Sequence, residues 1–124
     1  MKKQRPVNLD LTTIKFPATS HASILHRVTG VAMFFALLFV IWAWATSLTS
    51  AENFDMVVSV MSGVIGKIIT IGTLSALTYH IIGGIRHVIM DMGHWEELDS
   101  GTLSANIAIG LWIVLTIVIG VLVW

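Results

Sequence analysis

Long uncharged runs dominate the pattern of hydrophobic and polar positions along the chain. Residues 28–51 carry no charged side chain, and neither do residues 103–124. Each run is about 20 residues or more, the length that crosses the hydrocarbon core of a bilayer. A third run covers residues 68–85, and residues 56–66 extend it with Lys67 as the interruption. The pattern predicts three membrane-spanning segments.

The spans should be helical, because an unpaired backbone N–H or C=O group costs several kcal/mol in hydrocarbon. We therefore predict an all-α membrane protein with transmembrane helices at about 24–49, 60–90 and 103–124, which together form one domain over residues 24–124. Residues 1–23 are predicted to be a separate N-terminal segment. The stretches around 46–53 and 92–104 are expected to be loops.

Basic residues set the expected orientation. The first span is preceded by a basic segment containing Lys2, Lys3, Arg5, Lys15 and Arg27, whereas Lys67 and Arg86 lie singly near the two loops. Segments rich in Lys and Arg stay in the cytoplasm. We predict a multi-pass protein of a bacterial inner membrane, with a cytoplasmic N-terminus and a periplasmic C-terminus.

Composition narrows the chemistry. Charged residues make up 11% of the chain, against about 25% in soluble proteins, so the lipid bilayer is the expected surrounding. The formal net charge of zero gives no reason to propose a nucleic-acid partner. The chain has no cysteine, which excludes iron–sulfur ligation and covalent haem attachment within it. Any haem would be held non-covalently.

Two polar clusters interrupt the apolar spans, where an ionisable side chain is costly and is by default a functional hypothesis. One face of the first helix carries Ser23, His26, Arg27 and Gly30. One face of the second helix carries Ala76, His80, Gly83, Gly84 and His87. Consecutive spans are antiparallel, so both clusters should meet at the cytoplasmic side. We interpret them as one site.

The residue types indicate what this site could hold. His80 lies roughly 9 Å deeper than Arg86 along the helix axis, and a neutral imidazole at that depth is a good axial ligand for haem iron. Gly84 leaves room for a porphyrin, and His26 and Arg27 could meet haem propionates or a quinone carbonyl. Other interpretations stay open: His80 could only hydrogen-bond between helices, and Arg27 could only anchor the helix at the interface. The residues indicate a redox or ligand-binding membrane subunit.

Two signatures carry a resemblance to a known family. The segment Ser23-x-x-His26-Arg27-x-Thr29-Gly30, preceded by Arg5-Pro6, resembles the first signature of the cytochrome b subunit of succinate dehydrogenase. The segment His80-x-x-x-Gly84-Ile85-Arg86-His87, continuing to Met90-Asp91-x-Gly93, resembles the second. The opening from Arg5 to Leu11 is similar to the enterobacterial-type members. The resemblance covers the whole chain in order and in span count.

The resemblance implies the larger membrane anchor of succinate:ubiquinone oxidoreductase, which is respiratory complex II of the tricarboxylic acid cycle. It implies three partners: a flavoprotein that oxidises succinate, an iron–sulfur subunit and a second small anchor that completes a heterodimeric bundle. One haem b would lie between the two anchors, with His80 as the axial ligand from this chain. Ser23 and Arg27 match ubiquinone-binding residues. His26 matches a neighbour of the haem propionates and the quinone pocket, whereas His87 could line the pocket or contact a propionate.

The histidine spacing agrees with a second anchor. His80 and His87 lie two turns apart on one helix, about 10.5 Å, and cannot ligate the same iron. The predicted third helix has no histidine, so the second axial ligand is expected from another subunit. In the quinone site, Ser23 would hydrogen-bond a carbonyl oxygen and Arg27 would stabilise negative charge that develops on reduction.

Two alternatives remain. A quinol:fumarate reductase anchor would run the reverse reaction with the same kind of subunit. A non-redox membrane packing or assembly subunit would use its glycines only for close helix contacts; a transporter is disfavoured because three helices without an inverted repeat make a poor one.

Overall fold

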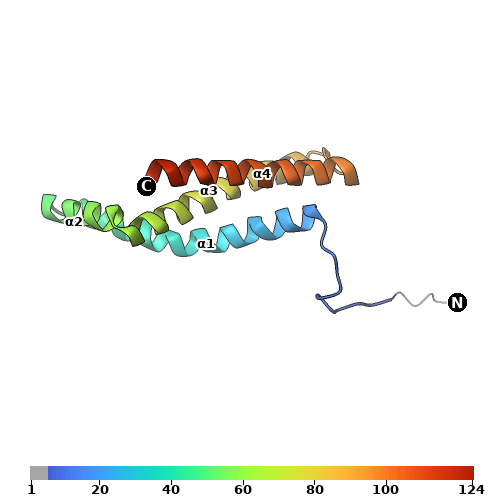
Figure 1. The fold of residues 1–124 in the computed structure, drawn as a ribbon, viewed down its shortest axis with the longest axis horizontal. Coiled ribbons are helices and arrows are strands. Elements are labelled where there is room, and N and C mark those ends of the chain that lie inside the picture. The colour runs from blue at the N-terminus through green and yellow to red at the C-terminus, as the bar shows by residue number, and fades with distance from the viewer. Residues whose placement is uncertain (1–5) are drawn as a thin grey trace.

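Three long helices packed side by side make up the bundle. The computed structural model describes residues 6–124. Over these residues it has no strand and four helices: α1 (Ala18–Ser47), α2 (Ala51–Ser62), α3 (Val64–Asp91) and α4 (Leu98–Val123). Helices α1, α3 and α4 are each long and apolar enough to cross a membrane, and each contacts the other two (Figure 1). The prediction of an all-α, three-span membrane protein is confirmed, while Lys2, Lys3 and Arg5 of the basic segment lie outside the described residues.

The first helix begins at Ala18 rather than at the predicted residue 24. Pro17 is its N-cap, with an extended backbone (φ −70°, ψ 162°), and proline suits a helix start because it has no N–H to satisfy. The 30 residues of α1 correspond to about 45 Å of helix, against about 30 Å of hydrocarbon. The charge pattern did not reveal where the helix begins.

The predicted helix 60–90 is divided in two, and much of the predicted loop 46–53 is helical. Ser50 caps α2 by accepting a hydrogen bond from the backbone N–H of Asn53 at 3.1 Å. The chain then breaks at Gly63, which has an extended backbone. A Cβ on Gly66 would collide with the backbone at Val60 and Met61, so glycine allows α3 to leave this break tightly. Because residues 56–66 around the break carry no charge, the charge pattern did not reveal it.

The last helix begins at Leu98 instead of residue 103. The turn before it uses a left-handed backbone at Gly93 (φ 84°), which glycine adopts without strain. Asp99 lies in the first turn of α4, where a negative charge favours the helix dipole. The predicted loop 92–104 is therefore about half helix.

Small and polar side chains join the helices, while large apolar side chains cover the outside. Ala22, Ala76, Ala105 and Ala108 are buried, a pattern that lets helix backbones approach closely in membranes. Many large side chains on α1 and α4 are exposed, including Phe34, Phe35, Leu111, Ile117 and Val121. Such a surface is suited to lipid or to another membrane helix rather than to water.

Candidate functional site

Three histidine side chains from α1 and α3 meet at one place. The ring of His26 stacks on the ring of His80, with centroids 4.1 Å apart and planes 7° apart. The ring of His87 lies 4.8 Å from that of His26 at an angle of 51°. All three side chains are half-buried. The structure thus brings together the polar faces of α1 and α3.

Glycines opposite the rings allow this approach. A Cβ on Gly83 would lie 2.9 Å from Cδ2 of His26, and a Cβ on Gly30 would lie 3.1 Å from Cε1 of His80. Both distances are shorter than ordinary van der Waals contact, so a side chain at either position would press on a ring. Gly84 differs, because its Cβ would meet Nε2 of His26 at an ordinary 3.7 Å. Packing of the rings therefore depends on Gly30 and Gly83 more than on Gly84.

The hydrogen bonds of His80 identify its protonated nitrogen. Its Nδ1 lies 3.2 Å from the carbonyl oxygen of His26 and 3.5 Å from the hydroxyl of Thr29. Because a carbonyl oxygen can only accept, Nδ1 carries the proton in a neutral ring and Nε2 keeps its lone pair. Within residues 6–124, Nε2 of His80 makes no hydrogen bond. In a neutral ring, Nε2 of His80 is therefore left with a lone pair that no residue of the described chain uses.

His87 is held by its own helix. Its Nδ1 donates to the carbonyl oxygen of Gly83 at 2.8 Å, one turn back along α3. Among the described residues, no group of three or more His, Asp or Glu side chains could hold a bare metal ion. Haem differs from a bare ion because the porphyrin supplies four nitrogens, and the protein adds axial ligands. A single histidine from this chain is compatible with that chemistry.

Ser23 and Arg27 lie one turn apart on α1, next to the histidines. Ser23 is half-buried and Arg27 is exposed. In the part of the chain that the structure describes, neither side chain makes a hydrogen bond. The structure therefore places both residues on the same helix as His26, and within the described residues no hydrogen bond joins them to His80 or His87.

Tyr79, which the sequence pattern gave no role, joins two helices. Its side chain is fully buried, and its hydroxyl donates to the carbonyl oxygen of Ala22 at 2.8 Å. Its ring meets the ring of Trp112 edge-on, with centroids 5.0 Å apart. Tyr79 thus fastens α1 to α3 beside Ser23 and His80. The available signal was a polar hydroxyl within an apolar span, adjacent to the proposed ligand.

Comparison with known proteins identifies the family. A family model described as the succinate dehydrogenase/fumarate reductase transmembrane subunit matches residues 1–119. The chain belongs to this family. A relative named succinate dehydrogenase cytochrome b556 subunit, from Coxiella burnetii, is 34% identical over 100% of both chains. Proteins of the same name are 33% identical in Rickettsia felis (98% of this chain, 91% of the relative) and 29% identical in Paracoccus denitrificans (91% and 87%).

Family membership confirms the resemblance that the two signatures suggested. As a succinate dehydrogenase cytochrome b subunit, the chain is a membrane anchor that belongs to an oxidoreductase complex. The histidines, glycines and Tyr79 described above lie at the contact between α1 and α3 of this anchor.

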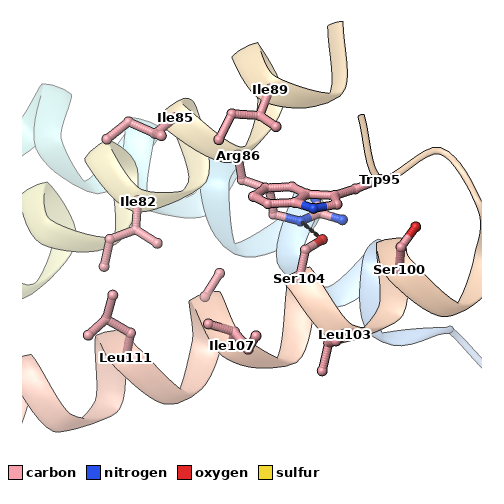
Figure 2. Close-up of a pocket in the computed structure, with 11 residues that line it drawn as sticks. Ile82, Ile85, Arg86, Ile89, Trp95, Ser100, Leu103, Ser104, Ile107 and Leu111 are labelled. Carbon is pink, nitrogen blue, oxygen red and sulfur yellow. Dashed lines mark hydrogen bonds between the residues drawn. The ribbon is translucent and has the colours of Figure 1, made fainter. Parts of the chain in front are cut away.

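Arg86 joins α3 to α4 in the same anchor. The residue is 5% exposed. Its Nε donates to the hydroxyl of Ser104 at 3.0 Å, and its Nη2 donates to the carbonyl oxygen of Gly101 at 3.2 Å. Figure 2 shows Arg86, Ser104 and Trp95 at one end of a cavity between the two helices. The cavity holds about 330 Å³, and most of its lining is apolar. Arg86 thus fixes the start of α4, a role that the sequence interpretation missed.

Proposed function

We propose that this chain is the larger membrane anchor of a succinate:ubiquinone oxidoreductase, working as respiratory complex II in a bacterial inner membrane. Its partners would be a flavoprotein that oxidises succinate, an iron–sulfur subunit and a second small anchor. The observation that carries the proposal is the meeting of His26, His80 and His87 at one contact between α1 and α3. Ionisable side chains gathered at membrane depth mark functional sites.

The residues at this contact fit haem b. His80 offers an unprotonated Nε2 while its Nδ1–H is bonded to a carbonyl oxygen, the arrangement typical of histidines that ligate metals. His26, Arg27 and His87 would supply the surroundings of the haem propionates, and Gly84 would leave room beside the porphyrin. When bound, haem b would take up and release one electron. The chain's part is to hold the ligand nitrogen, to limit access of water and to balance the propionate charges.

Ser23 and Arg27 would bind ubiquinone at the cytoplasmic end of α1. A serine hydroxyl can donate to a neutral quinone carbonyl, and a guanidinium stabilises the negative charge that develops on the carbonyl oxygen during reduction. Their side chains make no hydrogen bond within residues 6–124, and Arg27 is exposed. They are thus free to bind a quinone or the partner subunits that enclose it.

A second anchor is supported by two features of this chain. The large apolar side chains exposed along α1 and α4 offer a surface on which further membrane helices could pack. His87 cannot be the second ligand on the iron of His80, because the two lie about two turns apart on the same helix. The partner anchor would therefore supply the other protein ligand of the haem iron, and this chain would form half of a heterodimeric bundle.

Purification of the complex through a tag on this chain tests the proposal. The preparation should contain a flavoprotein, an iron–sulfur protein and a second small membrane subunit, with a b-type band in the reduced-minus-oxidised spectrum. It should reduce ubiquinone with succinate faster than it oxidises a menaquinol with fumarate. The opposite preference would favour the fumarate reductase anchor. A complex without a b-type band would favour the non-redox packing subunit, in which the His80 to His26 hydrogen bond only joins helices.

A further inference from the structure

The side chain of Thr29 lies between the backbone of α1 and His80, the proposed haem ligand. Its side chain is 6% exposed. Its hydroxyl donates to the carbonyl oxygen of His26 at 3.0 Å, and its oxygen is 3.5 Å from Nδ1 of His80. Since the hydroxyl hydrogen points to the His26 carbonyl, the lone pairs of the same oxygen are available to Nδ1–H. Two oxygen acceptors on α1 therefore share the Nδ1–H group of His80.

The His80 ring is also confined by packing against His26 and Gly30. The parallel ring of His26 covers one face, with planes 7° apart. On α1 the space beside Gly30 admits the ring edge that carries Cε1 and Nδ1, since a Cβ there would lie 3.1 Å from Cε1. Stacking limits tilt of the ring, and the two acceptors limit rotation within its plane. Residues of α1 thus set both the orientation of the His80 ring and which nitrogen carries the proton when the ring is neutral.

We propose that Thr29 is a positioning residue for haem ligation: with the His26 carbonyl, its hydroxyl keeps the proton of His80 on Nδ1 and fixes the ring, so that Nε2 is the ligand nitrogen. This inference rests on the proposed function, because it assumes that His80 ligates haem. It assigns a role to Thr29 that differs from a plain helix contact. Hydrogen-bond partners of ligating histidines typically change metal affinity about 10–100-fold when they are removed.

The experiment uses the complete purified complex and three variants. Thr29→Val keeps the shape and removes the hydroxyl, whereas Thr29→Ser keeps the hydroxyl. Thr78→Val is the matched control, because the Thr78 hydroxyl likewise bonds a carbonyl of its own helix, that of Leu74 at 2.7 Å, without a bond to His80. The readouts are the rate of haem transfer to excess apomyoglobin and the electron paramagnetic resonance spectrum of the oxidised haem, which reports the orientation of the axial ligands.

We expect Thr29→Val to transfer haem about tenfold faster or more, with shifted g values, and Thr29→Ser and Thr78→Val to match the wild type. A purely structural role of Thr29 would lower the yield of complex without moving the g values of the haem that is bound. Unchanged transfer and g values in Thr29→Val would overturn the inference. Equal changes in Thr29→Ser or Thr78→Val would also overturn it, because the effect would then not belong to the Thr29 hydroxyl.

Gly30→Ala probes the same contact without removing any hydrogen-bonding group. The new methyl group would press on Cε1 of His80, so the g values should shift, and unshifted g values would contradict the positioning of the ring by α1. If Thr29→Val does not assemble, this variant still tests whether α1 positions the His80 ring, and a normal transfer rate and normal g values in it would overturn the inference. A wild-type complex without haem would refute the proposed function itself. A wild-type complex with haem and silent Thr29→Val and Gly30→Ala variants would refute only this inference.

Discussion

Replacement of Arg27 should separate quinone reduction from succinate oxidation. The Arg27 side chain is exposed and makes no hydrogen bond within residues 6–124, so its removal leaves no buried partner of this chain unpaired. Exposed substitutions of this kind usually change stability by no more than about 0.5 kcal/mol. A change in quinone reduction would therefore not arise from unfolding of this anchor.

The size of the effect follows from the bond that would be lost. A hydrogen bond from a charged donor contributes about 1.5–3 kcal/mol, and one to a neutral group about 0.5–1.5. If these bonds form as the quinone is reduced, Arg27→Leu should slow ubiquinone reduction about 10- to 100-fold and Ser23→Ala about 2- to 10-fold. Arg27→Lys keeps the charge but not the planar guanidinium, and it should recover part of the rate.

The assay compares two activities on the same membranes. Succinate:ubiquinone reductase activity should fall in Arg27→Leu, whereas electron transfer from succinate to a soluble artificial acceptor should persist, because succinate oxidation is assigned to the flavoprotein. Lys15→Leu is the matched control, since it removes an exposed basic residue just before α1 that has no assigned role. Parallel loss of both activities in Arg27→Leu would make Arg27 a structural anchor and refute the quinone assignment. The same conclusion would follow if Arg27→Lys kept the full quinone reductase rate while Arg27→Leu assembled poorly.

Three further predictions concern topology and packing. A tag after Met1 should be protected in intact cells and one after Trp124 should be accessible from the periplasm; the reverse labelling would contradict the orientation. Gly83→Ala should destabilise the anchor by about 1–3 kcal/mol through overpacking against His26, while Gly84→Ala should be tolerated. Thermal unfolding in detergent measures both variants, and an equal loss of stability in the two would contradict these glycine contacts. Tyr79→Phe should cost about 0.6 kcal/mol, the average for one hydrogen bond between membrane helices, and leave the haem spectrum unchanged; an altered spectrum would mean that Tyr79 acts on the haem site.

The sequence predicted the parts of the fold that depend on hydrophobicity and periodicity. Uncharged runs located the three spans because lipid accepts few charges. Antiparallel helices and a 3.6-residue period were enough to place His26, His80 and His87 at one contact. Helix ends were predicted less well. The charged residues that bound the uncharged runs do not mark where a helix begins, whereas the N-cap residues Pro17 and Ser50 do.

Contacts between helices could not be predicted from one helix at a time. The hydrogen bonds of Thr29, Tyr79 and Arg86 reach residues on other helices. These bonds depend on how one helix is shifted along the next, and the periodicity of a single helix does not contain that shift. Gly30 and Gly83 were recognised as small residues on polar faces, but which ring each one faces required the packed bundle. Ser23 and Arg27 have no hydrogen-bond partner within residues 6–124, and the roles proposed for them involve molecules beyond this chain.

Ligation of haem iron by His80 can be examined with the reduced-minus-oxidised spectrum of a complex that carries His80→Leu. The wild-type complex and His94→Leu, a substitution in the exposed loop before α4, should show the same low-spin b-type band. His80→Leu should lose that band because leucine has no nitrogen to offer the iron. An unaltered band in His80→Leu, together with loss of the band in His87→Leu, would contradict the account and move the ligand to His87.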